Sequence, residues 1–178
     1  AMVCGQPEDP STQIGALISL EHLQKVESYI ELGVEEGGTI LTGGTREMTG
    51  TVTAVDSGAF LRPTIIDGLD HTSRTSTEEI FGPVVTVHRF DTDEQAIEMA
   101  NSTEYGLAGS IWSTNIDRAH ALAQQIETGI IWVNTWLHRD LRTPFGGVKN
   151  SGVGREGGNW SLGFFSEPLN VCIKHDQE

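Results

Sequence analysis

The stretch that most constrains this chain runs from residue 144 to residue 158 and contains six glycines in fifteen residues. Glycine at this density permits positive φ angles and lets the backbone approach a ligand or another strand closely. A flexible linker is the alternative, but it would consist of glycine and serine, whereas Phe145, Val148 and Arg155 interrupt this stretch. The stretch is therefore predicted to be a shaped loop at which something binds or docks.

Part of this loop, from Gly152 to Gly157, also matches the letters G-x-G-x-x-G of a dinucleotide-binding turn. That turn requires a strand directly before it and an acidic residue about 20 positions after it, within one βαβ unit. The preceding apolar run ends well upstream, near Asn134, and few residues follow Gly157. We therefore interpret this match as accidental.

From residue 84 onward the sequence indicates an α/β fold. Strand-like apolar runs alternate with segments of helical spacing, with predicted bounds of 84–90 (strand), 92–101 (helix), 107–112 (strand), 117–128 (helix) and 130–134 (strand). This order predicts right-handed crossovers and an open, mostly parallel twisted sheet with flanking helices. Gly129 is predicted to cap the second helix. The last strand is apolar throughout, which is typical of a strand buried on both faces.

Before residue 84 one helix is clearly indicated. Five apolar residues recur near the helical period and are predicted to line one face: Leu20, Leu23, Val26, Ile30 and Val34. Ser19 is the predicted N-cap, and the glycine pair 37–38 is the predicted stop.

The other segments outside the regular region are predicted from shorter signals. They are an extended lead-in to residue 18, a short strand at 39–41, an exposed loop or hairpin at 43–58, a strand at 60–66, a helical turn at 160–165 and a terminal strand at 169–174. Pro63 cannot donate a ladder hydrogen bond, so the strand that contains it is expected at a sheet edge.

Composition excludes several classes of partner. The chain carries 11 basic and 25 acidic residues, a net charge of −14, which argues against nucleic acid and anionic membranes. Cys4 lies ahead of the predicted fold and Cys172 lies in the terminal strand, with no spacing typical of zinc or of a disulfide framework. A cytoplasmic protein that contacts neither nucleic acid nor a membrane is expected.

Two long motifs resemble signatures of the NAD(P)-dependent aldehyde dehydrogenases. Residues 144–156 read P-F-G-G-x-K-x-S-G-x-G-R-E, and residues 79–84 read E-I-F-G-P-V. Residues 105–109 and 129–134 also fit, so the resemblance extends from about Asp9 over nearly the whole chain.

Within that family the run R-D-L-R-T at 139–143 is most similar to the 2-hydroxymuconic and 2-aminomuconic semialdehyde dehydrogenases. The resemblance implies three regions. They are a lead-in with a residue of an expression tag at 1–18, a partial catalytic domain at 19–165, and a C-terminal oligomerisation strand and tail at 166–178.

The resemblance also implies a site for NAD or NADP. It assigns Glu79 to the hydroxyls of the nicotinamide ribose, because a carboxylate can accept hydrogen bonds from them. It places Phe81 beside the ribose and the nicotinamide ring. His22 and Lys25 fall where the family often places further ribose contacts, although the family more often has Gln at the first position. The alternatives are a surface or capping glutamate, a core phenylalanine and a solvated lysine.

For the substrate, Phe145 corresponds to an aromatic wall of the aldehyde tunnel. Arg139 and Arg142 precede it, and a guanidinium binds a carboxylate through two parallel hydrogen bonds, so an acidic semialdehyde is expected. Structural ion pairs with Asp140 or Glu156 are the alternative for these arginines.

The family mechanism requires a cysteine nucleophile and a glutamate base, and no residue of this chain matches either, so no catalytic residue is assigned. We therefore expect a C-terminal fragment of an aldehyde dehydrogenase that is inactive alone, binds NAD(P) weakly or not at all, and acts on a small aldehyde. It would form a homo-oligomer or combine with a complementing N-terminal chain. The competing hypothesis is a non-catalytic remnant that serves as an oligomerisation or regulatory module.

Overall fold

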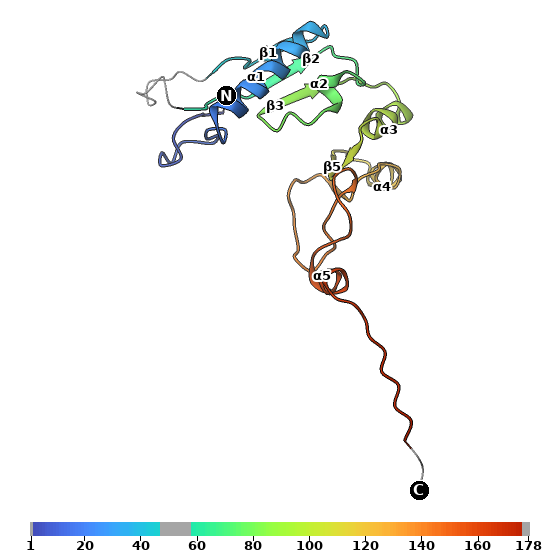
Figure 1. The fold of residues 1–178 in the computed structure, drawn as a ribbon. Coiled ribbons are helices and arrows are strands. Elements are labelled where there is room, and N and C mark those ends of the chain that lie inside the picture. Colours follow the sequence, from blue (N-terminus) through green and yellow to red (C-terminus); the bar gives the residue numbers. More distant parts are fainter. Residues whose placement is uncertain (1, 47–57, 176–178) are drawn as a thin grey trace. The chain divides into compact units, whose positions relative to one another are not determined.

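The computed structural model describes residues 2–46 and 58–175 and divides into two compact units, Ala1–Thr92 and Asp93–Glu178 (Figure 1). The first unit contains α1 (Leu20–Glu35), β1 (Thr39–Thr42), β2 (Thr64–Asp67), α2 (Arg74–Thr77) and β3 (Val84–Val87). The second contains α3 (Asp93–Asn101), β4 (Tyr105–Gly106), β5 (Ala108–Ile111), α4 (Ile116–Ala123), β6 (Ile130–Val133), β7 (Val148–Lys149) and α5 (Gly158–Phe165).

In the first unit, α1 packs its apolar stripe on a three-stranded sheet of order β1-β2-β3. β1 pairs with β2 antiparallel and β2 pairs with β3 parallel. Leu23, Val26 and Ile30 of α1 are buried together with Leu61 and Ile80, and they form the core of this unit. The outer members of the predicted apolar face, Leu20 and Val34, are exposed at the two ends of the helix. The predicted helix is confirmed at both ends. The Ser19 side chain accepts a hydrogen bond from the backbone N–H of the third helical residue, and Gly37 follows the helix with φ 95°.

Two predictions for the first unit are wrong. The strand predicted at 60–66 was expected at a sheet edge because of Pro63, but β2 is the central strand of the sheet. β2 begins at Thr64, directly after Pro63, so the proline lies outside the ladder of hydrogen bonds. Cys4, predicted to lie ahead of the fold, is buried inside it. Its backbone forms an isolated β-bridge with Ile14, and its thiol contacts the carbonyl of Leu61 at 3.6 Å. Most of the predicted loop at 43–58 lies outside the described residues.

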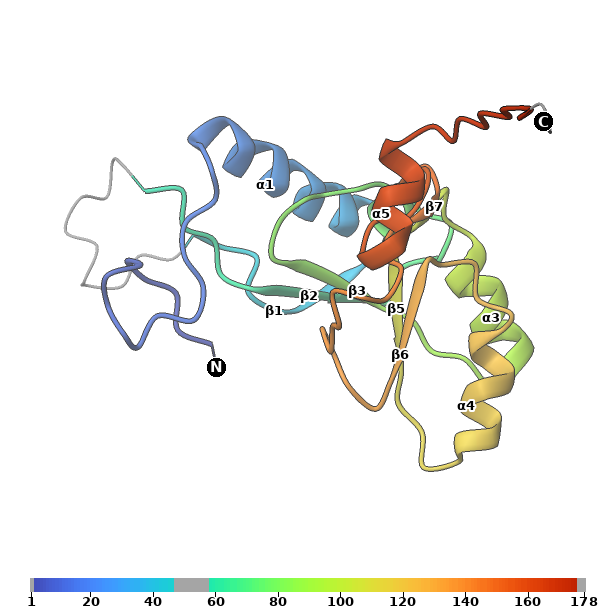
Figure 2. The same ribbon diagram turned by 90° about the horizontal axis from the view of Figure 1, so that it is seen from below.

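In the second unit, β5 and β6 are parallel and α4 connects them, which confirms the second of the two predicted crossovers. The first predicted crossover does not join paired strands, because β3 pairs with β2 in the sheet of the first unit. Figure 2 shows α3 and α4 side by side next to this pair of strands. Arg118 of α4 forms an ion pair with Asp93 at the start of α3. A second, antiparallel pair joins β4 to β7, a short strand inside the glycine-rich loop that the sequence did not predict.

Gly129 does not cap α4, which ends earlier, at Ala123. Instead its N–H donates to the carbonyl of Gly106 at 3.1 Å, and an added Cβ would lie 1.6 Å from the carbonyl oxygen of Gly146. The residue is therefore needed for the close approach of the glycine-rich loop. β6 is less buried than predicted, because only Trp132 of its residues is buried and β5 is its only sheet partner within the described part of the chain.

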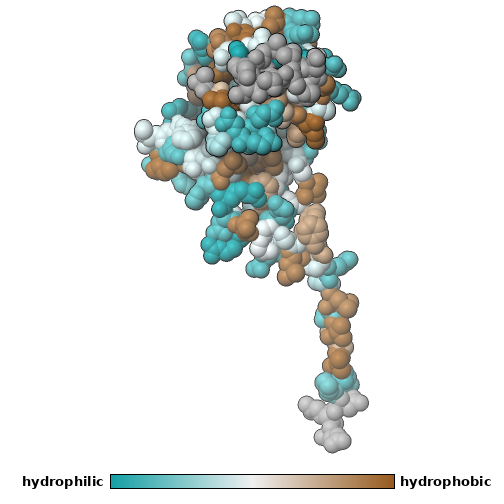
Figure 3. Space-filling view, turned by 90° about the vertical axis from the view of Figure 1, so that its left-hand side faces the viewer, coloured by the Kyte–Doolittle hydropathy of each residue, from teal (hydrophilic) through white to brown (hydrophobic). Residues whose placement is uncertain are grey.

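The last helix, α5, confirms the predicted helical turn. An extended arm, residues 166–175, follows it. Leu169, Val171 and Ile173 of this arm are 86%, 69% and 73% exposed, and Figure 3 shows hydrophobic surface along the arm. No ladder forms along the arm, because a strand needs a paired neighbour, so its role as an oligomerisation strand stays a prediction. Among the described residues, no helix has the length and apolar character needed to span a membrane.

Candidate functional site

The first candidate site is the segment of residues 79–82, which lies against α1. Ile80 is buried in the core between two exposed residues, Glu79 and Phe81. Gly82 sits directly on α1, since an added Cβ would lie 2.7 Å from a methyl group of Val26. The burial of Ile80 and the close packing of Gly82 on α1 therefore direct Glu79 and Phe81 to solvent.

The structure brings the four residues that the sequence assigned to the cofactor into one cluster. The Nε2 atom of His22 lies 2.6 Å from the carbonyl oxygen of Phe81, and the two rings meet edge to face with centroids 6.1 Å apart. The Nζ of Lys25 donates to the carbonyl oxygen of Glu79 at 3.2 Å. Both α1 side chains thus reach the backbone of the segment.

A third α1 side chain also reaches this region. The hydroxyl of Tyr29 donates to Glu78 Oε2 at 2.6 Å, and Arg74 donates to both oxygens of the same carboxylate at 2.8 and 3.0 Å. The hydrogen bonds from Arg74 and Tyr29 lower the pKa of Glu78 to about 2. Glu36 accepts hydrogen bonds from the backbone N–H groups of Arg74 and Thr75, which fixes the start of α2.

Glu79 and Phe81 themselves are open to a ligand. No hydrogen bond or ion pair engages the Glu79 carboxylate among residues 2–46 and 58–175. The Phe81 ring is 72% exposed, and its backbone has φ 61°, which a non-glycine residue rarely adopts. An acceptor-only carboxylate beside an exposed aromatic ring matches the hydroxyls and flat ring of a nicotinamide riboside, so these residues fit that part of NAD(P).

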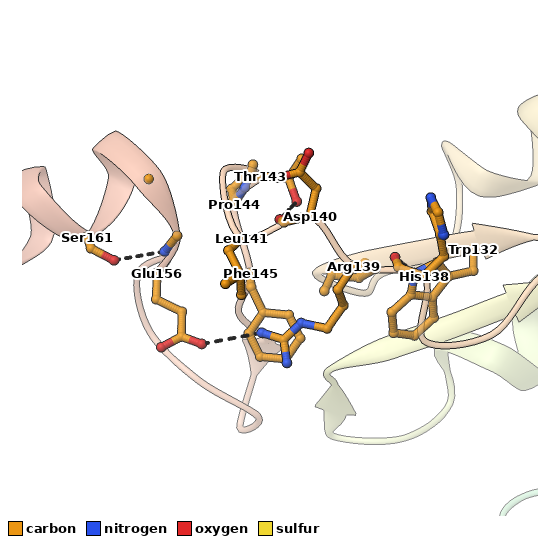
Figure 4. A pocket seen from close by; sticks show the side chains of 13 residues that line it. Trp132, His138, Arg139, Asp140, Leu141, Thr143, Pro144, Phe145, Glu156 and Ser161 are labelled. Atoms are coloured by element: carbon orange, nitrogen blue, oxygen red, sulfur yellow. Dashed lines mark hydrogen bonds and ion pairs between the residues drawn. The ribbon is translucent and has the colours of Figure 1, made fainter.

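The second candidate site is a pocket of about 370 Å³ in the second unit (Figure 4). It is lined by Ile130 and Trp132 of β6, by residues 138–145 except Arg142, by residues 156–158 of the glycine-rich loop and by Ser161 of α5. The Trp132 indole N–H donates to the carbonyl of His138 at 2.8 Å, which ties the loop after β6 back to that strand.

Arg139 and Phe145 meet inside this pocket. The guanidinium carbon of Arg139 lies 3.9 Å from the centroid of the Phe145 ring, a cation–π contact. Figure 4 shows the same guanidinium directed toward the Glu156 carboxylate, with a closest N–O distance of 3.7 Å. That separation is an ion pair without a hydrogen bond, so the donors of Arg139 remain available.

Arg142 is held differently. Its Nε and Nη2 atoms donate to both oxygens of Asp140 at 2.5 to 3.1 Å, and its backbone N–H donates to Asp140 Oδ1 at 2.9 Å. These hydrogen bonds lower the pKa of Asp140. Both ion pairs that the sequence left open as alternatives are thus present, with Asp140 on Arg142 and Glu156 on Arg139.

The glycine-rich loop shapes this pocket. Phe145 and Glu156 exchange two backbone hydrogen bonds of 2.8 Å, which close the loop at its base. Gly157 has φ 102°, and an added Cβ would lie 2.3 Å from the carbonyl oxygen of Thr143. Although α5 opens after Gly157, the nearest strand is β7 in an antiparallel pair, so the loop is not part of a βαβ dinucleotide-binding unit.

The two cysteines lie outside both sites. Cys4 is buried, and Cys172 is exposed on the C-terminal arm. Among the described residues, no group of three or more His, Cys, Asp or Glu side chains could hold a metal ion.

Sequence reasoning missed Tyr29, Glu78 and Arg74 around the first site and Trp132 in the second. Tyr29 was detectable in principle, because it follows His22 and Lys25 at helical spacing and therefore shares their face of α1. Trp132 carried no such signal, since its role depends on a carbonyl in a loop of irregular structure.

Comparison with known proteins identifies the family of the chain. The sequence model of the aldehyde dehydrogenase family matches residues 1–171. The chain is 50% identical over 98% of its length to 2-hydroxymuconic semialdehyde dehydrogenase of Pseudomonas sp. (strain CF600), and 51% identical over 97% to 2-aminomuconic 6-semialdehyde dehydrogenase of Pseudomonas sp.. It spans 35% of the length of each.

Among solved structures, the chain is similar to a point mutant of betaine aldehyde dehydrogenase from Staphylococcus aureus in complex with NAD⁺. The TM-score is 0.86 at 39% identity, and the match covers 92% of this chain and 33% of the other. These matches confirm the resemblance to the aldehyde dehydrogenases that the sequence motifs indicated.

Proposed function

The chain belongs to the aldehyde dehydrogenase family, and on this premise we propose that it supplies the nicotinamide-ribose and aldehyde sites of an NAD(P)-dependent semialdehyde dehydrogenase. The reaction would oxidise an acidic semialdehyde to a carboxylic acid. Its closest support in the chain is the cluster at α1, where an unengaged carboxylate and an exposed aromatic ring are held side by side.

For the cofactor, we assign Glu79 to the two hydroxyls of the nicotinamide ribose and Phe81 to the adjacent ring face. Lys25 uses one N–H on the carbonyl of Glu79 and has two more for ribose oxygens, while His22 holds the carbonyl of Phe81. The bound cofactor would supply hydride acceptance, and these residues would orient its nicotinamide end.

For the substrate, we assign Arg139 and Arg142 to a carboxylate remote from the aldehyde and Phe145 to the wall that excludes water. Arg139 is the stronger candidate, because its ion pair with Glu156 leaves its donors available, whereas Arg142 would first have to leave Asp140. The names of the two Pseudomonas relatives, both semialdehyde dehydrogenases, support this substrate class.

We propose that the chain alone does not turn over aldehydes, because both thiols lie outside the two sites. It would act in the cytoplasm, where thiols stay reduced, either as a homo-oligomer or with a complementing N-terminal chain. The second candidate, a non-catalytic oligomerisation or regulatory module, is favoured by one observation, the exposed apolar residues of the C-terminal arm.

The cofactor assignment can be tested by joining this chain to the part of the Pseudomonas 2-hydroxymuconic relative that it does not match. Glu79→Gln should raise KM for NAD⁺ by about tenfold, because an amide cannot accept from both ribose hydroxyls as a carboxylate does. Glu31→Gln, an exposed change elsewhere on α1, is the matched control. An unchanged KM for NAD⁺ in Glu79→Gln would overturn the assignment, and an inactive fusion with intact fold would favour the non-catalytic candidate.

A further inference from the structure

The proposed nicotinamide-ribose site is supported by one face of α1. His22, Lys25 and Tyr29 occupy positions i, i+3 and i+7, which lie above one another along a helix. They contact the carbonyl of Phe81 at 2.6 Å, the carbonyl of Glu79 at 3.2 Å and the carboxylate of Glu78 at 2.6 Å, respectively. Successive turns of one helix thus bind three residues of one four-residue segment, 78–81.

We propose that this face, the polar rail of His22, Lys25 and Tyr29, positions Glu79 and Phe81 for the cofactor, and that Tyr29 and Glu78 are positioning residues of the site. This inference rests on the proposed function. The Tyr29 hydroxyl does not bind Glu79 or Phe81 directly. Tyr29 acts through Glu78, the residue immediately before Glu79.

The segment needs such support because of its backbone. Phe81 has φ 61°, a conformation that persists in a non-glycine residue only when its surroundings enforce it. The ring is 72% exposed, so packing of the Phe81 side chain cannot enforce it. The hydrogen bond from His22 to the Phe81 carbonyl and the seat of Gly82 on Val26 are the contacts that do.

Glu78 fixes the other end of the segment. Its carboxylate receives Tyr29 from α1 and both donors of Arg74 from α2, while Glu36, at the end of α1, caps α2. Each link runs between α1, α2 and residue 78, so the three form a closed network. This network engages one of two adjacent carboxylates and leaves the next one, Glu79, for the ligand.

The test uses NMR on the 178-residue chain and does not require turnover. Tyr29→Phe removes one hydroxyl, and Glu78→Gln removes one charge. Tyr105→Phe and Glu31→Gln are matched controls, because within the described part of the chain neither the Tyr105 hydroxyl nor the Glu31 carboxylate makes a hydrogen bond or ion pair. For each variant the backbone ¹⁵N order parameters and carbonyl ¹³C shifts of residues 79–81 are measured.

In Tyr29→Phe and Glu78→Gln, the order parameters of residues 79–81 should fall from about 0.85 toward about 0.6, and their carbonyl shifts should change, while β1 to β3 stay unaltered. Both controls should match the wild type. Unchanged order parameters and carbonyl shifts at residues 79–81 in both Tyr29→Phe and Glu78→Gln would overturn the proposal. An equal change in the two control variants would overturn it as well.

Titration with nicotinamide mononucleotide then separates the rail from the site. The wild-type chain should show ligand-dependent shifts at Glu79 and Phe81, and Tyr29→Phe should weaken this binding by about fivefold, the value of one ordinary hydrogen bond. If the wild type shows no such shifts, the cofactor assignment fails while the order parameters still decide whether the rail holds the segment. Equal affinity in wild type and Tyr29→Phe would refute positioning for the cofactor.

Discussion

Replacing Arg139 with leucine should convert the proposed enzyme from one that prefers a carboxylated aldehyde to one that does not. The guanidinium stands in the pocket over the Phe145 ring at 3.9 Å, with Glu156 at 3.7 Å and 43% of its side chain exposed. A substrate carboxylate can therefore take the bidentate position that Glu156 does not occupy. Leucine keeps the apolar contact with Phe145 and removes only the charge and the donors.

The expected size of the effect follows from the contact that is lost. A charge-assisted hydrogen bond contributes about 1.5 to 3 kcal/mol, which corresponds to about 10- to 150-fold in kcat/KM. The loss should fall on the acidic semialdehyde and leave an uncharged aldehyde of similar length nearly unaffected. Arg142→Leu should discriminate less, because Arg142 is already bound to Asp140 through both oxygens.

The assay is steady-state reduction of NAD⁺ by the fused enzyme, with 2-hydroxymuconic semialdehyde and an uncharged aldehyde as the substrate pair. Arg89→Leu serves as a control for loss of a surface arginine, since that side chain is 88% exposed. If Arg139→Leu lowers kcat/KM equally for both substrates, the arginine supports the loop through Glu156 and Phe145, and the specificity argument is refuted.

Three further predictions concern the fold and its surface. Gly129→Ala should destabilise the chain by about 3 kcal/mol in urea unfolding, because its Cβ would overlap the carbonyl of Gly146, whereas Gly163→Ala, with open space around it, should be neutral or slightly stabilising. The Glu78 carboxyl should titrate by NMR near pH 2 and not near 4.5. Because its pKa is depressed in the folded chain, its contribution to stability is complete above about pH 4.5 and is lost as the pH falls through about 2. A clean monomer in light scattering at micromolar concentration would contradict our expectation that the chain self-associates through its apolar arm, and Val171→Asp should weaken that association.

The parts of the fold that could be predicted from the sequence depend on contacts between near neighbours. The N-cap at Ser19 and the stripe of α1 arise within one helix, and the β5-α4-β6 crossover follows from a local order of apolar periods. The errors involve distant partners. The buried Cys4 thiol contacts the carbonyl of Leu61, and Gly129 is required by a carbonyl in the glycine-rich loop. Neither partner can be recognised from the sequence next to Cys4 or Gly129.

The adjacent pair Glu78 and Glu79 shows the same limit at the candidate site. By residue type the two are identical, and the family motif marks only the second. What distinguishes them physically is Arg74, one helical turn before Glu78, together with Tyr29, 49 positions away on α1. Those contacts consume one carboxylate and leave the other unengaged. A short motif can therefore name the residue that meets the ligand, while the residues that determine its availability lie on another element and must be found by following the contacts.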